Sequence, residues 1–282
     1  MKALTGKTIF ITGASRGIGR EIALRCANAG ANIVIAAKSD KPHPKLAGTI
    51  HTVAEEVVQQ GGQALAVRVD VRDEEQVRSA MEEGVRRFGG LDALINNASA
   101  IHLQNLQNTK TNRFDLLHSV NTRGTFVCSQ AAIPYLRKSE NAHIITLSPP
   151  INFGTHWLGP YIPYTTTKYS MTLLSLGLAE ELRADEIAVN TLWPRTIIAT
   201  AAVEFAIDAE LLKASRTPAI MGDAAYEILT SEKGSLSGQS LIDEELLRAR
   251  GYTDFDRYKN DPACEELCID LYIDENNKGE SL

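Results

Sequence analysis

Thr12-Gly13-Ala14-Ser15-Arg16-Gly17-Ile18-Gly19 is a glycine-rich stretch between a short apolar run, residues 8–11, and a run with helical periodicity that stops at Gly30. The helical run is marked by apolar residues three or four positions apart: Ile18, Ile22, Cys26 and Ala29. A glycine-rich turn between a strand and a helix presents backbone N–H groups and a helix N-terminus to a pyrophosphate. The stretch therefore predicts a dinucleotide-binding turn, and the alternative is an ordinary loop between a strand and a helix.

Each glycine of this stretch has its own structural reason. Gly13 permits the tight turn, Gly17 lets the backbone approach a phosphate, and Gly19 allows the helix to pack closely on the strand. The spacing is G-x-x-x-G-x-G, which differs from the G-x-G-x-x-G of long dehydrogenases.

Short apolar runs alternate with helical patterns along the whole chain. The predicted strands cover residues 8–11, 32–37, 64–69, 91–95, 143–147, 187–192 and 240–242. The predicted helices cover about residues 18–29, 49–60, 73–88, 119–137, 164–182 and 224–229. Such alternation produces right-handed βαβ units. We therefore expect an α/β fold, with a seven-stranded parallel sheet flanked by helices in a single doubly wound, Rossmann-type domain over residues 1–282.

Two parts of this domain are predicted to be less regular. Residues 195–222 are expected to form a loop over the substrate with one short helix. The chain from about residue 244 is charged, and we expect an irregular tail.

Composition excludes several classes of protein. A formal net charge of −6 argues against a nucleic-acid partner, because phosphate backbones attract basic patches. No run approaches about 18 apolar residues, so we expect no membrane span. The first seven residues lead straight into a strand and leave no room for a signal peptide, and four cysteines suit a reducing compartment, so the cytoplasm is expected. Cys264 and Cys268 alone offer too few ligands for a closed metal site, so no metal is expected.

A tyrosine and a lysine, Tyr164 and Lys168, are four positions apart on a predicted helix and so project from one face. A phenol with a pKa near 10 is a poor proton donor or acceptor at neutral pH, and a neighbouring ammonium lowers that pKa. The pair therefore suits proton transfer to or from an alcohol oxygen. The alternative is a surface Tyr–Lys pair on an amphipathic helix.

Taken together, several motifs in one order resemble the short-chain dehydrogenase/reductase family, over residues 5 to about 245. They are Thr12 to Gly19, Asp70, Asn96-Asn97-Ala98, Asn121, and Tyr164 with Lys168. A closer likeness to one subgroup of that family is carried by residues 36–38, 42–45, 148–150, 193–196 and 242–244.

The resemblance implies roles for individual residues. Tyr164 would be the catalytic acid/base, and Lys168 would bind the nicotinamide ribose as well as tune Tyr164. Asn121 would hold a water in a proton relay, or it is a satisfied polar residue inside a helix. The residues implied to bind the cofactor are Gly13, Ser15, Arg16, Gly17, Ile18, Gly19, Lys38, Asp70 (at the adenine), Asn97, Tyr164, Lys168, Ile198 and Thr200.

The chain departs from the family pattern at two places. The family's catalytic serine is the second of two small residues that end the fifth strand, and here Ser148 takes the first position and Pro149 the second. Ser148 has either moved into the catalytic role or only ends the strand. Arg195 replaces a glycine of the family's P-G-x-x-x-T region, on which the carboxamide contacts of Ile198 and Thr200 depend.

From these observations we expect an NADP-dependent oxidoreductase that interconverts a small-molecule alcohol and its carbonyl compound, with a lipid-like substrate. NADP is favoured over NAD because Ala37 stands where NAD enzymes commonly place a carboxylate, with Lys38 and Arg16 nearby. Pro149 and Arg195 leave open a cofactor-binding protein with little turnover. In the resembled family the helices near 119–137 and 164–182 pack against partner subunits, so a homodimer or homotetramer is expected.

Overall fold

The computed structural model describes residues 2–206 and 209–274, and its central feature is a seven-stranded sheet in which every neighbouring pair of strands is parallel. The strands are β1 (Thr8–Thr12), β2 (Asn32–Ala37), β3 (Gln63–Arg68), β4 (Ala93–Asn96), β5 (His143–Thr146), β6 (Ala188–Trp193) and β7 (Ser240–Ile242). Their order in the sheet is β3-β2-β1-β4-β5-β6-β7. The predicted fold class is confirmed.

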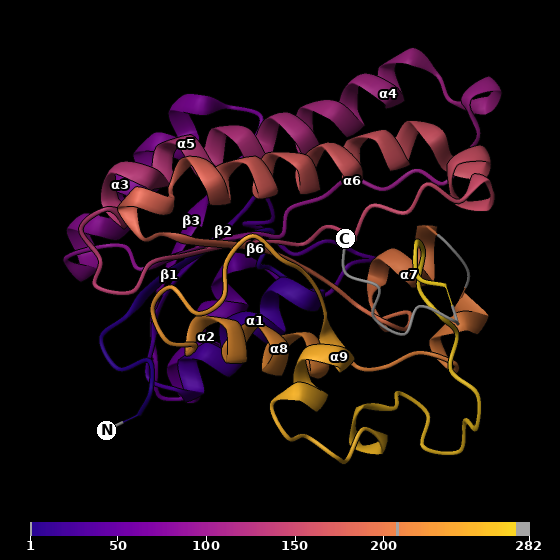
Figure 1. The fold of residues 1–282 in the computed structure, drawn as a ribbon. Coiled ribbons are helices and arrows are strands. Elements are labelled where there is room, and N and C mark those ends of the chain that lie inside the picture. The colour runs from indigo at the N-terminus through magenta and orange to yellow at the C-terminus, as the bar shows by residue number, and fades with distance from the viewer. Residues whose placement is uncertain (1, 207–208, 275–282) are drawn as a thin grey trace.

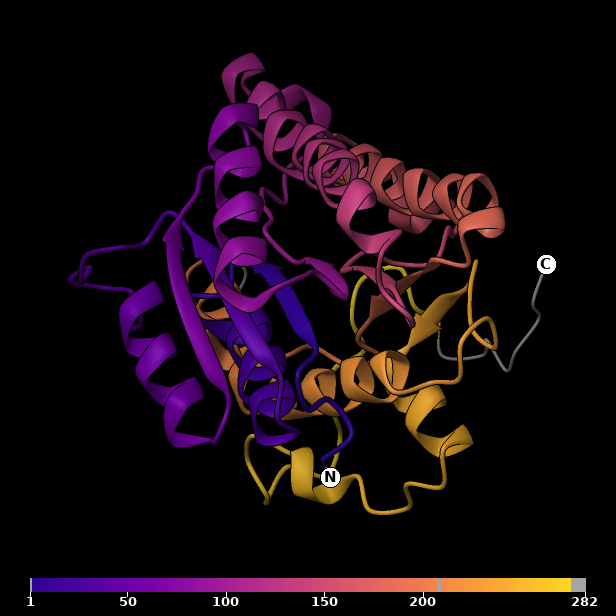
Figure 2. The ribbon, with the colours of Figure 1, turned by 90° about the vertical axis from the view of Figure 1, so that its left-hand side faces the viewer.

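Helices cover both faces of this sheet (Figures 1 and 2). One layer holds α1 (Gly17–Asn28), α2 (Ile50–Gln59), α8 (Ala219–Leu229) and α9 (Asp243–Ala249). The other holds α3 (Glu74–Phe88), α4 (Thr111–Leu117), α5 (Gly124–Leu136) and α6 (Thr155–Glu181). α7 (Ala201–Ala206) lies beside the sheet's carboxyl edge, and short 3₁₀ turns cover Leu106–Asn108, Arg183–Asp185, Ala209–Leu212 and Asp256–Tyr258. Among the described residues, no helix is long and apolar enough to cross a bilayer.

Strand β2 shows why the runs of the central strands are apolar throughout. Ile33 and Ile35 pack into the hydrophobic cluster under α1 and α2, whereas Val34 and Ala36 pack into the cluster on the opposite face. A parallel sheet covered by helices on both sides buries both sets of alternate residues.

Helix α6 begins at Thr155, nine residues before the predicted start at Tyr164. Tyr161 interrupts it with non-helical backbone angles (φ −133°, ψ 29°), so two helical pieces meet at a kink. Pro163 falls in the first turn of the second piece. Backbone N–H groups there have no partner within the helix, so the missing N–H of proline costs no hydrogen bond. Pro160 and Pro163 are therefore accommodated inside α6.

The predicted helix near 119–137 belongs to a longer one. It starts with α4 at Thr111, passes through a π-helical segment over His118–Arg123 and continues as α5. The π-helical segment holds Asn121 fully buried. Such widened turns occur often at functional sites.

The substrate loop is more ordered than predicted. Within residues 195–222 the chain forms α7, the 3₁₀ turn Ala209–Leu212 and the start of α8, which begins at Ala219 directly after Pro218. Residues 207 and 208 lie outside the described part of this loop.

The prediction of an irregular tail from about residue 244 is wrong for its first part. Residues Asp243–Ala249 form α9, with Leu246 and Leu247 buried against the sheet. Further on, the chain returns to the carboxyl edge of the sheet, where Thr196 and Ile269 form an antiparallel bridge. A seven-residue helix and a single bridge are too short to leave a periodic signal in the sequence. Residues 275–282 of the tail lie outside the described range.

Candidate active site

A cavity of about 520 Å³ opens at the carboxyl ends of the strands, beside the point where the strand order reverses between β1 and β4. In open α/β sheets this position is where ligands bind. The residues predicted from the sequence that line it are Gly13, Ser15, Arg16, Gly17, Ile18, Lys38, Asp70, Asn97, Tyr164, Lys168, Ile198 and Thr200. Three predicted residues, Gly19, Asn121 and Ser148, lie behind its walls.

The glycine-rich turn forms one end of the cavity. Gly13 and Gly17 have φ values of +67° and +58°, which side chains other than glycine rarely adopt. A Cβ on Gly13 would lie 2.9 Å from the Cα of Ala98, and one on Gly19 would lie 2.5 Å from Nδ2 of Asn97. Asn97 in turn donates hydrogen bonds to the carbonyls of Thr12 (2.8 Å) and Gly13 (3.2 Å). The backbone is thus bare and fixed at the start of α1, as a pyrophosphate requires.

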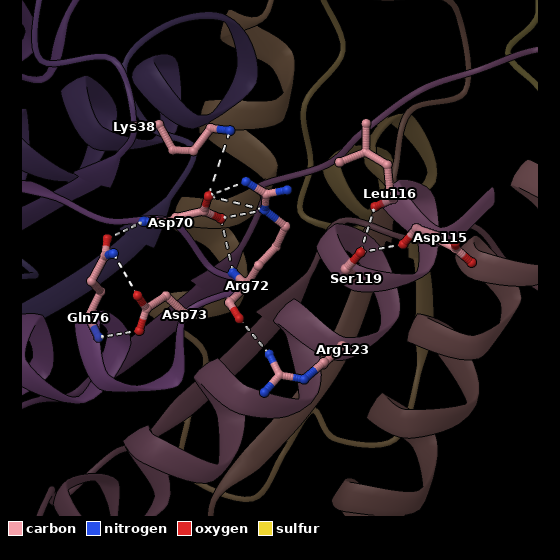
Figure 3. Close-up of polar contacts among 9 residues, drawn as sticks. All are labelled: Lys38, Asp70, Arg72, Asp73, Gln76, Asp115, Leu116, Ser119 and Arg123. Carbon is pink, nitrogen blue, oxygen red and sulfur yellow. Dashed lines mark hydrogen bonds and ion pairs between the residues drawn. The ribbon is translucent and has the colours of Figure 1, made fainter. Parts of the chain in front are cut away.

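Two charged residues of the cavity lining beyond this turn, Lys38 and Asp70, lie in a cluster of polar contacts (Figure 3). The carboxylate of Asp70 accepts hydrogen bonds from Arg72, at 2.6 Å from Nη2, and lies 3.8 Å from Nζ of Lys38. Hydrogen bonding by Arg72, with a smaller contribution from the Lys38 charge, lowers the pKa of Asp70. Asp70 therefore stands at the predicted adenine end with its charge already paired.

Arg16 connects the glycine-rich turn to the loop after β2. Its Nε donates to the carbonyl of Ala47 at 3.0 Å, and its Nη2 donates to Gly48 (2.9 Å) and to Oγ of Ser39 (3.2 Å). Neutral oxygens thus hold the guanidinium, so its charge remains available at the rim.

Tyr164 and Lys168 lie one turn apart on α6 and are almost wholly buried, with 3% and 2% of their surfaces exposed. Nζ of Lys168 donates to the carbonyl of Leu147 at 2.8 Å and lies 5.1 Å from the centre of the Trp193 ring. Burial lowers the pKa of the Lys168 ammonium to about 7.

Burial also raises the pKa of the Tyr164 phenol well above its ordinary value, and the charges of Tyr272 and Asp270 raise it further. The net shift of this pKa is therefore upward, because burial outweighs the lowering that was expected from Lys168. The physical reason is that the cavity removes water from both side chains, which disfavours the charged form of each.

Asn121 fastens the end of β4 to α6 from behind the cavity wall. Its Oδ1 accepts from the Ala100 N–H (2.7 Å) and the Ser99 hydroxyl (3.1 Å), and its Nδ2 donates to the Ala100 carbonyl (3.0 Å) and Oγ1 of Thr167 (3.0 Å). These four bonds use both donors and both acceptor lone pairs of the amide. Asn121 is thus placed as a positioning residue for the segment that carries Ser99.

Ser99 is a cavity residue that was not predicted. It lines the same wall as Tyr164, and its hydroxyl is a hydrogen-bonding partner that lowers the pKa of the Tyr164 phenol. The sequence signal was its place directly after Asn96-Asn97-Ala98, at the carboxyl end of a strand.

Ser148 is fully buried away from the cavity. Its Oγ accepts a hydrogen bond from the Thr172 hydroxyl at 3.0 Å, and the same hydroxyl lies 2.7 Å from the Pro149 carbonyl. The structure therefore does not bring Ser148 to Tyr164.

The segment after β6 runs along the cavity to the glycine-rich turn. The Arg195 N–H donates to Oδ1 of the buried Asp243 at 2.8 Å, so an arginine is held where the family pattern has glycine. Ile198 is buried in the wall, and a Cβ on Gly17 would lie 3.4 Å from Cγ2 of Thr200. The shifted spacing still brings Ile198 and Thr200 to the cavity.

The returning tail closes the opposite side, which the sequence did not predict. Asp270 and Leu271 line the cavity beside Tyr164 and Lys168. Tyr272 packs against Trp157 and Trp193, with ring centres 5.8 and 6.2 Å apart. The sequence indicated this contact only by the run of Asp270, Leu271 and Tyr272, which places two large apolar residues in a charged tail.

The comparisons with known proteins agree with this geometry. The family model for short chain dehydrogenases matches residues 7–210. Hydroxysteroid dehydrogenase-like protein 2 of Rattus norvegicus is 53% identical over 273 residues, which are 97% of this chain and 52% of that relative, so the chain spans about half of its length. The subgroup likeness read from the sequence was to proteins of that name.

Two solved structures share nearly the whole fold. One from Xanthomonas campestris is 50% identical, with a TM-score of 0.92 over 96% of this chain and 99% of the other. A short chain dehydrogenase from Mycobacterium thermoresistibile is 48% identical, with a TM-score of 0.90 over 96% of each chain.

Replacing Lys168 by Met should remove a pH-dependent part of the stability. The ammonium has an ordinary pKa of 10.5 and one of about 7 in the fold, so between these values the unfolded chain binds more protons. The free energy of unfolding of the wild type should therefore rise with pH relative to Lys168→Met, by up to about 1.4 kcal/mol per pH unit between pH 7 and 9. Urea unfolding of both proteins across this range measures the difference in their free energies of unfolding. A difference that does not change with pH would contradict the lowered pKa of Lys168.

Proposed function

The chain belongs to the short-chain dehydrogenase/reductase family, and we propose that it is an NADP-dependent oxidoreductase that interconverts an alcohol and its carbonyl compound. The observation that carries this proposal is one cavity with a bare glycine-rich turn at one end and the buried pair Tyr164 and Lys168 at the other. When bound, the nicotinamide cofactor supplies or accepts the hydride. The residues of this chain bind it and move the proton.

The charged rim supports NADP rather than NAD. Lys38 directly follows β2, where a carboxylate would repel a 2′-phosphate, and Arg16 lies on the adjacent turn. The charge of Asp70 is already paired with Arg72. A 2′-phosphate at this end would meet two cations and a neutralised acid.

Tyr164 is suited to give a proton to a carbonyl oxygen. Its raised pKa keeps the phenol protonated at neutral pH, so it is a hydrogen-bond donor when a carbonyl compound enters. Lys168 faces the same space with its Nζ held by Leu147. Its charge favours the phenolate that forms as the proton leaves.

Ser99 is the hydroxyl best placed to hold the substrate oxygen with Tyr164. It faces the cavity, whereas Ser148 is bonded to Thr172 behind the wall. Asn121 holds Ser99 by its hydroxyl, which can turn from that amide to an oxygen in the cavity.

The cavity wall around the pair supports an apolar, lipid-like substrate. The apolar residues of its lining include Ala100, Ile101, Leu116, Val120, Leu147, Trp193, Val203 and Leu271. Walls of this kind stabilise a hydrocarbon body while a few polar groups orient its oxygen.

Assembly into a homodimer or homotetramer is proposed from the layer of α4, α5 and α6. Phe126 on α5 and Leu173 on α6 are 49% and 60% exposed, and Phe114 on α4 is 41% exposed. Large apolar side chains on neighbouring helices suit a two-fold subunit interface.

The cytoplasm is the proposed location, supported by the free thiols of Cys26 and Cys128.

A cofactor-binding protein with little turnover is the second candidate function. The observation that favours it is that Pro149 stands at the family's serine position while the neighbouring Ser148 is buried and bonded to Thr172. Measurement of NADPH binding beside a screen of alcohols and carbonyl compounds separates the two candidates, because binding without any turnover supports the second.

Replacing Tyr164 by Phe should abolish turnover and leave cofactor affinity nearly unchanged. Loss of a positioned proton donor costs about a hundred- to ten-thousand-fold in rate. Lys168→Ala should weaken both turnover and cofactor binding, because the ammonium serves both. Steady-state rates and NADPH titration by fluorescence check these results, and wild-type activity in Tyr164→Phe on a verified substrate would refute the mechanism.

Ser99→Ala should lower turnover by roughly tenfold or more, because it removes a hydrogen bond to the substrate oxygen of the kind found in oxyanion holes. Ser148→Ala should have a much smaller effect. Ser235→Ala is the control for loss of a serine hydroxyl outside the site, because Ser235 lies in an exposed loop and its hydroxyl donates to the Glu232 carbonyl. The opposite ranking of Ser99→Ala and Ser148→Ala would assign the role to Ser148.

Lys38→Ala should weaken NADPH binding by about tenfold and leave NADH binding unchanged, because only the 2′-phosphate adds charge at that position. Dissociation constants for both nucleotides, measured by calorimetry, provide the test. Lys138→Ala, an exposed lysine after α5, is the control. Equal affinities of the wild type for NADH and NADPH would overturn the NADP assignment.

A further inference from the structure

One carboxyl group in the cavity takes no part in the proposed reaction. Asp270 lies in the returning tail, is half-buried, and lines the same cavity as Tyr164 and Lys168. Its charge acts on both of them, favouring the ammonium of Lys168 and disfavouring the phenolate of Tyr164. The distant end of the chain thus contributes a charged group to the reacting end of the site.

The backbone holds Asp270 in this place from both sides. Its N–H donates to the Arg195 carbonyl at 3.0 Å, next to the bridge between Thr196 and Ile269. Its Oδ1 accepts from the Leu271 N–H at 2.6 Å, and Nε1 of Trp193 donates to the Leu271 carbonyl at 3.0 Å. The carboxyl group therefore has a defined position and does not depend on a free tail.

The next residue fixes the turn further. Tyr272 has a φ of +70°, a conformation that a bulky residue keeps only where its surroundings impose it. It is almost completely buried, and its hydroxyl lies 3.0 Å from Oγ1 of Thr165 on α6. The tail is thus attached to the helix that carries Tyr164.

Asp270 places a negative charge opposite Lys168 at the reacting end. Lys168 faces the cavity from α6 and Asp270 faces it from the tail, while Asp243, at the start of α9, acts on Asp270 from behind. A lone buried ammonium would attract anions, and Asp270 offsets that attraction. A second carboxylate placed here would meet a like charge in a medium that screens poorly.

We propose that Asp270 determines the substrate class of the site, by excluding carbonyl compounds and alcohols that carry a carboxylate or phosphate near the reacting carbon and admitting uncharged, apolar ones. This inference rests on the proposed oxidoreductase function. Asp270 acts in it as a specificity-determining residue, and Tyr164 and Lys168 keep their roles.

Binding of octanoate and of octanamide, its uncharged counterpart, tests the proposal without requiring turnover. Calorimetry on the full chain with added NADP at pH 8 should show at least tenfold tighter binding of octanamide in the wild type. Asp270→Asn should reduce this preference to threefold or less, because it removes the charge and keeps the oxygen that accepts from Leu271. Asp270→Ser is a second neutral variant, should Asp270→Asn unfold by circular dichroism.

Two further variants separate charge from structure. Asp270→Glu should restore the preference for octanamide, since it restores the carboxylate. Asp256→Asn, a tail aspartate with 84% of its side chain exposed, should leave the preference as in the wild type. A preference that persists in Asp270→Asn or Asp270→Ser, or a wild type that binds octanoate as tightly as octanamide, would overturn the assignment.

Turnover of octan-2-one and of 2-oxooctanoate tests the underlying reaction separately. The wild type should reduce octan-2-one in preference, and Asp270→Asn should narrow the ratio of kcat/KM by about tenfold. If the wild type reduces neither compound nor any other in a carbonyl screen while the binding preference still follows Asp270, the proposed reaction fails and the exclusion of anions stands.

Discussion

The hydrogen bond from the buried ammonium of Lys168 to the carbonyl of Leu147 is the contact on which the site depends. A charged group with 2% of its surface exposed is costly unless it is bonded, and this bond joins α6 directly to the end of β5. It fixes the rotation of α6, and Tyr164, one turn earlier, must then face the same cavity. Tyr164, the proposed proton donor, thereby lies in the same cavity as the glycine-rich turn.

The returning tail sets the electrostatics of that end. It lines the cavity beside Tyr164 and Lys168, where burial raises the pKa of the phenol and lowers that of the ammonium. It also supplies a carboxyl group, Asp270, whose own pKa burial raises to about 7. A neutral phenol, an ammonium of lowered pKa and an opposing carboxyl group are compatible with the proposed transfer of a proton to an uncharged carbonyl compound.

The polar groups that follow β4 and β5 place two serine hydroxyls differently with respect to the cavity. The π-helical turn buries Asn121, whose amide holds both the Ala100 backbone and the Ser99 hydroxyl. Ser148 is instead held by Thr172 on α6, behind the wall. Neighbouring parallel strands end at the same edge of the sheet, so the proposal that Ser99 replaces the family's serine needs no change in the strand order.

The sequence by itself determined the parallel sheet, the glycine-rich turn and the pairing of Tyr164 with Lys168, because each depends on residues close together in the chain: apolar runs, glycine spacing and one helical turn. Only the tertiary structure decided the kinked start of α6, the burial of Ser148, the position of Ser99 and the return of Asp270. These depend on contacts between distant segments, such as that between Asp270 and Arg195, 75 positions apart. The direction of the pKa shift at Tyr164 was also decided by the tertiary structure. The sequence shows a lysine one helical turn away, whereas the removal of water is a property of the folded cavity.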